Sequence, residues 1–374
     1  MTTRQFIRGR VVTPTGVISD GLVAVAGDRI AEVRPAAPGQ VAARRAHWVL
    51  PGFVDIHVHG GAGASFTSGD PDQARAAVSF HRDHGTTTML ASLVSAPSEH
   101  LHEAVKRLGP LVDEGLLAGI HLEGPYLSPA RRGAHDPAHL RDPDPVELAG
   151  LLDLGGVRMV TLAPELPGAL GAIGRLRERG AVAAIGHTDA TYEQTRAAIE
   201  AGATVATHLG NAMRPLHHRD PGPIAALLDA PEVVCELIVD GAHLHEGMVH
   251  HVVRVAGPDR VALVTDAVAA AGMPDGAYEL GGRAVAVVNG VARLADGSAI
   301  AGSTGTMDAT IRRAVHSGMD IVDAAIMAAT TPARVLGLEA EIGALVAGRR
   351  ADLVLLDEDL TVTAVLRAGA AVRG

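Results

Sequence analysis

The chain has 374 residues, of which 47% are hydrophobic and only 2% aromatic, so its core must be built mainly from Ala, Val, Leu and Ile. The formal net charge of −10 argues against a nucleic-acid partner, because phosphate backbones are bound by clustered Lys and Arg. The N-terminus shows no apolar signal segment, and no stretch reaches roughly 18 uninterrupted apolar residues. We therefore expect no membrane span and a cytoplasmic protein, whose single cysteine, Cys235, is a buried structural thiol.

Both ends of the chain show short strand patterns separated by turns. Before residue 50 these are Phe6–Val12, Gly21–Ala26 and Ile30–Val33, and further strand patterns follow the turn at residues 348–350. Neither end holds enough strand to fold by itself. We therefore predict that residues 1–50 and 335–374 pair into a small β-sandwich domain, into which residues 51–334 are inserted.

Residues 51–334 alternate between strand and helix patterns. The strand patterns number about eight, which is the count of a closed (β/α)8 or TIM-like barrel in the α/β class. They are Phe53–His59, Thr86–Leu93, Leu117–Glu123, Arg158–Leu162, Val182–Gly186, Thr204–His208, Val233–Val239 and Val261–Thr265. An open doubly wound sheet is the alternative, which is weakened because no Gly-x-Gly-x-x-Gly turn follows the first strand. Near residues 275–295 the alternation lapses, and Asn289-Gly290 predicts the turn of an inserted hairpin.

Six histidine and acidic residues fall at the predicted carboxyl ends of these strands, where barrels of this type carry their active sites. They are His57, His59, Glu123, His187, His208 and Asp266. A single histidine in such a place is usually just hydrogen-bonded, but six ligand-type residues at one rim predict a metal site. Imidazole and carboxylate suit a divalent ion such as Zn²⁺ or Fe²⁺ and leave positions open for water.

The six residues divide into two candidate ligand sets. Glu123, His187 and His208 would hold one ion. His57, His59 and Asp266 would hold a second, with Glu123 as the bridge between them. A metal lowers the pKa of its bound water toward about 7, and Asp266 would take the proton from that water and deliver it to a leaving amine. We expect one or two ions per subunit, with Zn²⁺ as the first choice and Fe, Co or Mn as the alternatives.

Several longer motifs surround these residues. Pro-Gly-Phe-Val-Asp-Ile-His-Val-His-Gly (51–60) resembles the opening of the amidohydrolase superfamily barrel. The more specific motifs include His-Leu-Glu-Gly-Pro-Tyr (121–126), Gly-Ala-His-Asp-Pro (133–137), Gly-His-Thr-Asp-Ala (186–190), Thr-His-Leu-Gly-Asn-Ala-Met (207–213), Asp-Gly-Ala-His (240–243), Thr-Asp-Ala (265–267) and Ala-Gly-Ser-Thr (301–304). Together they resemble the N-acetylglucosamine-6-phosphate deacetylase family, nearly from end to end.

This resemblance implies hydrolysis of the 2-acetamido group to acetate and glucosamine 6-phosphate. It implies that Glu123, His187 and His208 are the common metal ligands, that His57 and His59 match the additional site of two-metal members, and that Asp266 is the catalytic acid/base. His135 and the Asn211-Ala212 backbone would contact the sugar, and His243 and Arg219 would bind the 6-phosphate. The family arginine is typically donated by the neighbouring subunit, which implies a homodimer.

Some positions leave alternatives open. Arg219 belongs to a basic cluster with Arg214, His217 and His218, which could also be a solvated surface loop. Met307 would line the acetyl pocket or fill the core. Gly210 and Gly305 stand where family members usually carry larger residues, which suggests a roomier pocket for a bulkier acyl group or another amino sugar.

The residues leave three functions open. Besides the deacetylase, the chain could carry another amidohydrolase activity, such as a related N-acyl amino-sugar deacetylase, a dihydroorotase-like enzyme or a deaminase. Those sites often use a modified lysine as the bridge, and the one lysine that we find, Lys106, is not at a strand end. A non-catalytic binding protein with the same barrel is disfavoured by the intact ligand set with Asp266.

Overall fold

The structure, a computed structural model, describes residues 4–373, which divide into two compact units. One unit contains the residues up to Asp55, residues 81–88 and the residues from Thr306 onward, and the other contains residues 56–80 and 89–305. Among the candidate site residues, Met307 alone lies in the first unit. A division into domains at residues 50 and 335 stays a prediction, because a compact unit is defined by contacts and not by independent folding.

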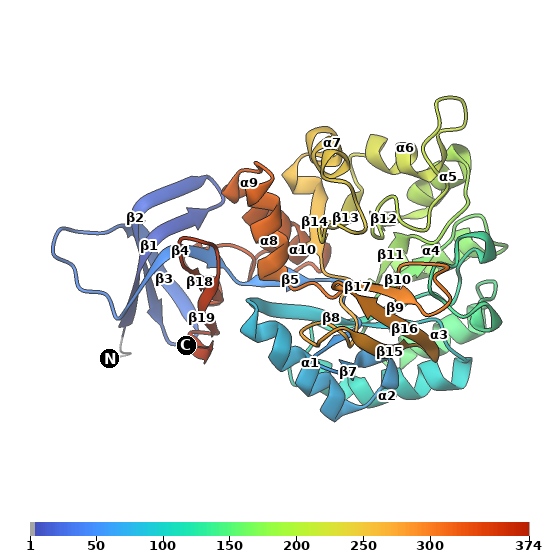
Figure 1. The fold of residues 1–374 in the computed structure, drawn as a ribbon, viewed down its shortest axis with the longest axis horizontal. Helices are drawn as coiled ribbons and strands as arrows, with labels where there is room; N and C mark the ends of the chain where they lie inside the picture. Colours follow the sequence, from blue (N-terminus) through green and yellow to red (C-terminus); the bar gives the residue numbers. More distant parts are fainter. Residues whose placement is uncertain (1–3, 374) are drawn as a thin grey trace. The chain divides into compact units, whose positions relative to one another are not determined.

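In the first unit, strands from both ends of the chain share one seven-stranded sheet (Figure 1). The strands are β1 (Arg4–Thr13), β2 (Gly16–Ala26), β3 (Arg29–Pro35), β4 (Arg44–Pro51), β18 (Leu353–Leu356), β19 (Val362–Arg367) and β20 (Ala370–Arg373). Their order is β20-β19-β18-β4-β1-β2-β3, and the two chain ends meet where β4 pairs with β18. Val23, Ile30 and Leu366 belong to one buried cluster although their strands are distant in this order, so the sheet folds over a shared core. The helical elements α8 (Met307–His316), α9 (Ile321–Ala325), a π turn (Ile326–Thr330) and α10 (Thr331–Val335) belong to the same unit.

Eight strands form the nearly closed parallel barrel that the strand count predicts. They are β5 (Phe53–Asp55), β8 (Thr86–Val94), β9 (Gly119–Glu123), β10 (Val157–Leu162), β11 (Val182–Ile185), β12 (Ala203–Ala206), β13 (Val234–Ile238) and β14 (Val261–Val264). The sheet order follows the chain, from β5 through β8 to β14. Because helices cover a parallel barrel on the outside and its interior is packed, its strands are shielded on both faces; every residue of β8, β9, β13 and β14 is buried.

Backbone hydrogen bonds complete the ring just beyond the carboxyl ends of β5 and β14. The amide of Asp266 donates to the carbonyl of His57 at 2.8 Å, and the amide of His59 donates to the carbonyl of Ala267 at 2.8 Å. The strand predicted over Phe53–His59 is therefore shorter than expected and ends at Asp55. The segment that follows is tied to its neighbours by these single bonds and not by a regular ladder.

Helices connect the barrel strands. They are α1 (Pro71–Asp83), α2 (Ser98–Asp113), α3 (Pro145–Asp153), α4 (Ala169–Glu178), α5 (Tyr192–Ala201), α6 (Gly222–Asp229) and α7 (Glu246–Ala256). Local sequence explains their starts: the Asp144 side chain accepts from the first amides of α3, and Thr191 with Gln194 forms a capping box at α5. On α2, Leu101, Val105 and Leu108 are buried at helical spacing. Within the described residues, we find no helix that combines the length and the apolar character needed to span a membrane.

A small sheet follows the last barrel strand. It consists of β15 (Gly276–Leu280), β16 (Arg283–Val288) and β17 (Val291–Leu294), paired in antiparallel order. Asn289 and Gly290 connect β16 to β17 with φ values of 52° and 73°, the left-handed backbone that a tight two-residue hairpin requires. The remaining short elements are β6 (Gly60–Gly61), β7 (Ala64–Ser65) and the 3₁₀ turns Phe66–Ser68, Pro129–Arg131, Pro137–His139 and Pro258–Arg260.

Candidate active site

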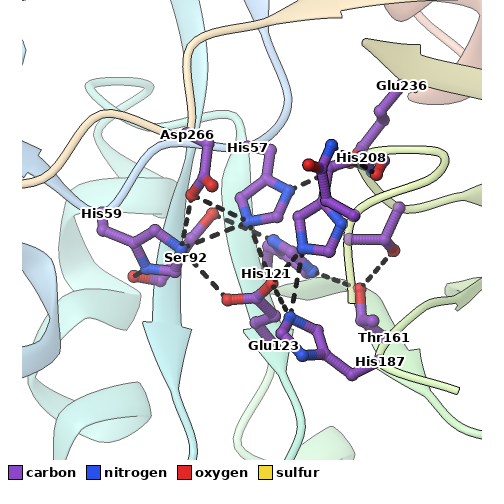
Figure 2. Close-up of polar contacts among 12 residues, drawn as sticks. His57, His59, Ser92, His121, Glu123, Thr161, His187, His208, Glu236 and Asp266 are labelled. Carbon is purple, nitrogen blue, oxygen red and sulfur yellow. Dashed lines mark hydrogen bonds and ion pairs between the residues drawn. The ribbon is translucent and has the colours of Figure 1, made fainter. Parts of the chain in front are cut away.

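The six predicted ligand residues converge at the carboxyl end of the barrel (Figure 2). Glu123 is the last residue of β9, and His187, His208 and Asp266 each lie two residues beyond β11, β12 and β14. These last three have positive φ values of 47°, 28° and 50°. Non-glycine residues adopt such backbone conformations only where the surroundings hold them, and they often do so at functional sites.

The two histidines of the first ligand set both contact the same carboxylate oxygen. Glu123 Oε1 lies 3.1 Å from His187 Nε2 and 3.0 Å from His208 Nε2. The two Nε2 atoms are themselves 3.1 Å apart. Three side chains from three different strand ends thus present their ligand atoms to one point.

The second set lies beside the first. The Nε2 atoms of His57 and His59 are 3.2 Å apart, and Asp266 Oδ1 lies 3.5 Å from the former and 3.2 Å from the latter. Glu123 reaches this set as well, with Oε1 at 3.5 Å from His57 Nε2 and Oε2 at 3.2 Å from His59 Nε2. The Glu123 carboxylate therefore lies between the two sets, where a bridging ligand would be.

The contacts of the other ring nitrogens show which nitrogen of these histidines faces the cluster. His59 Nδ1 lies 3.1 Å from the carbonyl of Ser92, and His187 Nδ1 lies 2.9 Å from the carbonyl of Arg131. A carbonyl only accepts, so Nδ1 donates in both, and Nε2 is the nitrogen that a metal ion would displace a proton from or bind directly. Imidazole nitrogens beside carboxylate oxygens form a donor set that fits a divalent metal ion.

The electrostatics of the cluster favour positive charge at its centre. Burial disfavours the imidazolium form of His59, but Asp266 and Glu123 outweigh it and raise the pKa of His59 to about 9. Burial would raise the pKa of Asp266, but the charges of His57 and His59 lower it to about 2. Burial would also raise the pKa of Glu123, but the neighbouring histidines hold it well below its usual range. Buried carboxylates that attract cations this strongly are suited to a metal ion.

Five of the six cluster residues, His59, Glu123, His187, His208 and Asp266, line a cavity of about 360 Å³. His135, Asn211, Ala212 and His243, the predicted sugar and phosphate contacts, all line it. His135 Nε2 lies 3.3 Å from Glu123 Oε2, close enough that Glu123, His135 and His187 also form a potential ligand set. Burial lowers the pKa of His135 to about 4 although Glu123 opposes this shift, so its imidazole is neutral.

His243 is held at the cavity wall by Asp240. Its Nδ1 lies 2.8 Å from Asp240 Oδ2, and its backbone amide donates to Asp240 Oδ1 at 2.9 Å. Burial lowers the pKa of His243, but the hydrogen bond and charge of Asp240 outweigh burial and raise it above its ordinary value. The pair therefore favours a positively charged donor in the cavity.

Two predicted contacts are not brought to this cavity. Arg219 is exposed on the loop before α6, and its Nη1 lies 2.7 Å from His218 Nε2. Within the same basic cluster, Arg214 is engaged by Asp189 and Asp220. Met307 is fully buried as the first residue of α8, in the other compact unit.

The two glycines that suggested a roomier pocket are not among the described residues that line the cavity. Gly210 has a φ of 90°, so a side chain there would strain the backbone. A Cβ on Gly305 would lie 3.2 Å from Ser303 Oγ. The roomier pocket stays a prediction.

Sequence reasoning missed a second layer of polar side chains inside the barrel. His121 is fully buried, with Nδ1 at 2.9 Å from Ser92 Oγ and Nε2 at 2.8 Å from Thr161 Oγ1. Glu236 is also fully buried and lies 2.9 Å from His57 Nδ1. The sequence could have indicated the role of Glu236, because a charged residue within the apolar strand β13 needs a buried partner.

Comparisons with known proteins agree with this site. The Amidohydrolase family model matches residues 48–372. An N-acetylgalactosamine-6-phosphate deacetylase from Escherichia coli O157:H7 is 38% identical over 360 residues, which cover 94% of this chain and 95% of that protein. An N-acetylglucosamine-6-phosphate deacetylase from Lysinibacillus sphaericus is 37% identical over 329 residues, 86% of this chain and 84% of that protein.

Solved structures extend the similarity to the whole fold. A mutant N-acetyl-D-glucosamine-6-phosphate deacetylase from Mycobacterium smegmatis, in complex with N-acetyl-D-glucosamine-6-phosphate, shares 49% identity, covers 100% of both chains and superposes with a TM-score of 0.96. A deacetylase of the same name from Thermotoga maritima shares 35% identity with a TM-score of 0.89, covering 98% of each chain. The chain therefore belongs to the amidohydrolase family and, within it, to the N-acetylglucosamine-6-phosphate deacetylases and their relatives.

Proposed function

We propose that this protein is a metal-dependent deacetylase that hydrolyses the N-acetyl group of N-acetylglucosamine 6-phosphate, giving acetate and glucosamine 6-phosphate. The proposal rests on the convergence of Glu123, His187 and His208 beside His57, His59 and Asp266, next to a cavity of about 360 Å³. The curated relatives and the solved structures described above are deacetylases of amino-sugar phosphates by name.

We assign the metal ligands from the contacts in the cluster. Glu123, His187 and His208 would hold one divalent ion, and His57, His59 and Asp266 a second, with Glu123 shared. When bound, such an ion supplies Lewis-acid chemistry, lowering the pKa of water and polarising an amide carbonyl. The nitrogen-rich donor set favours Zn²⁺, with Fe, Co and Mn as alternatives.

The protein's own groups would direct protons and orient the substrate. Asp266 has a pKa of about 2, so it is ionised at neutral pH and able to accept the proton of the attacking water and pass it to the amine. His135 would hydrogen-bond the acetamido group or the sugar beside Glu123. His243 would face the 6-phosphate, where the positive charge favoured by Asp240 suits a dianion.

We further propose a homodimer in which Arg219 reaches the neighbouring subunit's phosphate site. The exposed position of Arg219, outside the lining of its own cavity, supports this assignment. Mixing Arg219→Ala and Asp266→Asn subunits tests it. Restored turnover means that Arg219 acts across the interface, whereas a mixture as inactive as its components means that it acts within one subunit.

We place this reaction in the cytoplasm, because a sugar phosphate is a dianion that does not cross a lipid bilayer unaided. The function is tested by measuring acetate release from N-acetylglucosamine 6-phosphate, from unphosphorylated N-acetylglucosamine and from N-acetylgalactosamine 6-phosphate. We expect rapid release from the first and a strong loss without the phosphate. If neither phosphorylated sugar is hydrolysed, the substrate assignment is wrong.

A further inference from the structure

The buried carboxylate of Glu236 has no role in the proposed deacetylation as assigned above. It lies in the middle of β13 between Cys235 and Leu237, and all three residues are fully buried. A carboxylate in such surroundings is retained only where specific partners compensate for the loss of water.

Both partners of Glu236 belong to the metal cluster (Figure 2). Its Oε2 lies 2.9 Å from His57 Nδ1 and accepts the backbone amide of His208 at 3.1 Å. Its Oε1 has no hydrogen-bond partner among the described residues. The hydrogen bonds of Glu236 therefore go to one residue from each of the two ligand sets.

The contact with His57 decides which nitrogen of that ring is available for a metal. With Oε2 as the acceptor, Nδ1 carries a hydrogen, so Nε2, which lies 3.2 Å from His59 Nε2, is the ring nitrogen left to bind a metal ion. The opposite tautomer would place a hydrogen on Nε2 and prevent ligation. In His59 and His187 a main-chain carbonyl accepts the Nδ1 hydrogen, whereas in His57 the acceptor is the side chain of Glu236.

Charge gives a second reason for this carboxylate. Two divalent ions would bring four positive charges into the barrel, where Glu123 and Asp266 would supply two negative charges. Glu236 adds a third negative charge next to the ring of His57, without occupying a ligand position. A second ion would be less well compensated if this charge were removed.

We propose that Glu236 is a positioning residue that fixes the tautomer and orientation of His57 and so sets the occupancy of the metal position formed by His57 and His59. Through the amide of His208 it also ties this position to the neighbouring one. The proposal rests on the metal assignment of the proposed function, but not on the identity of the substrate.

The test is the zinc content and zinc affinity of the Glu236→Gln variant, measured without substrate. Metal-free protein is reloaded with Zn²⁺, ions per subunit are counted by mass spectrometry, and affinity is measured by chelator competition. We expect two ions in the wild type. In the variant, one ion is retained and the second is bound about 10- to 100-fold more weakly.

The matched control is Glu147→Gln, which neutralises another shielded carboxylate. Glu147 binds Arg141 at 2.5 Å and the Tyr126 hydroxyl at 3.1 Å, and neither of these partners is a cluster residue. This control should keep both ions. Equal zinc binding by Glu236→Gln and the wild type, or a wild type that binds only one ion, would overturn the proposal.

A double variant distinguishes the proposed positioning role of Glu236 from a merely structural role. In a His57→Asn background, Glu236→Gln should cause no further loss of affinity for the second ion, because its effect passes through His57. The metal-free proteins should also melt at the same temperature with Glu236 or Gln. An equal loss in both backgrounds contradicts the proposal. If Glu236→Gln does not fold, Glu236→Asp is used, and full affinity for both ions in that variant would equally contradict it.

Discussion

The Nε2 atoms of His187 and His208 lie 3.1 Å apart, although the two residues follow different barrel strands. Each is the second residue after its strand, and each has a left-handed backbone, with φ values of 47° and 28°. Such values strain a non-glycine residue, so neighbouring contacts must hold both segments in place. One of those neighbours is Gly186, which passes very close to the Thr207 side chain.

We predict that Gly186→Ala damages the site without touching a ligand. The added Cβ would lie 2.7 Å from Thr207 Cβ and 2.8 Å from Thr161 Cγ2, so the strand end must shift and carry His187 with it. The free energy of unfolding should fall by about 1–3 kcal/mol, and zinc affinity should fall as well. Denaturant titration and chelator competition measure the two effects.

The control for this prediction is Gly171→Ala on α4, where the new Cβ would meet no atom within 4 Å. Alanine is the better helix former, so this change should raise the free energy of unfolding by up to about 1 kcal/mol. If both variants are equally stable, the close approach at Gly186 does not constrain the site.

Replacing His208 by alanine should remove a metal ligand and most of the activity. We expect zinc at the Glu123–His187 position to be lost and kcat to fall by about 10³-fold, since Lewis-acid stabilisation contributes several kcal/mol. His251→Ala, an exposed histidine on α7, is the control and should keep both metal and activity. A His208→Ala enzyme with full zinc and full turnover would exclude this ligand set.

Asp266→Asn should separate proton transfer from metal binding. The amide keeps the shape of the side chain but cannot accept a proton, so kcat should fall by roughly 10²- to 10⁴-fold with a smaller change in KM. The ion at Glu123, His187 and His208 should remain, which metal analysis of the same sample checks. Activity within a few-fold of the wild type would assign the acid/base role elsewhere.

Asp240→Asn should change the pH dependence of substrate binding. Asp240 raises the pKa of His243 against the effect of burial, and an imidazole is charged below its pKa. Without the carboxylate, His243 loses its charge at a lower pH. KM for the phosphorylated sugar should therefore rise by roughly tenfold near neutral pH, which corresponds to the free energy that a charge-assisted hydrogen bond contributes to binding. Wild type and variant should converge as the pH falls well below 6.5, where both imidazoles are charged.

The unphosphorylated sugar is the control for the Asp240 prediction, because its KM should be the same in both proteins. A parallel rise for both sugars would mean that Asp240 shapes the cavity and does not tune the charge of His243.

Much of the fold and of the cluster could be predicted from sequence, because both follow from regular patterns. Parallel strands bring their carboxyl ends to one rim, so Glu123, His187, His208 and Asp266 could be grouped once their strands were recognised. Cys235 is fully buried, and burial raises the pKa of its thiol to about 12, as befits the structural thiol that its apolar surroundings indicated.

Other features could not be predicted from the sequence, for physical reasons. The helix α6 is short and nearly all apolar, with Ile224, Ala226, Leu227 and Leu228 all buried, so it shows no 3.6-residue alternation to recognise. The first barrel strand ends at Asp55 because single backbone bonds from neighbouring segments replace its ladder, and the apolar pattern continues past that point. The side-chain partner of Glu236 is 179 residues away in the chain, and only the folded barrel identifies it as His57.

Metal-dependent deacetylation is tested most directly by acetate release from N-acetylglucosamine 6-phosphate by metal-stripped protein, before and after addition of Zn²⁺. We predict no turnover in the stripped protein and recovery that follows the number of ions bound per subunit. Turnover that survives complete removal of the metal, or fully loaded protein that releases no acetate, would contradict a metal-dependent deacetylase at this cluster.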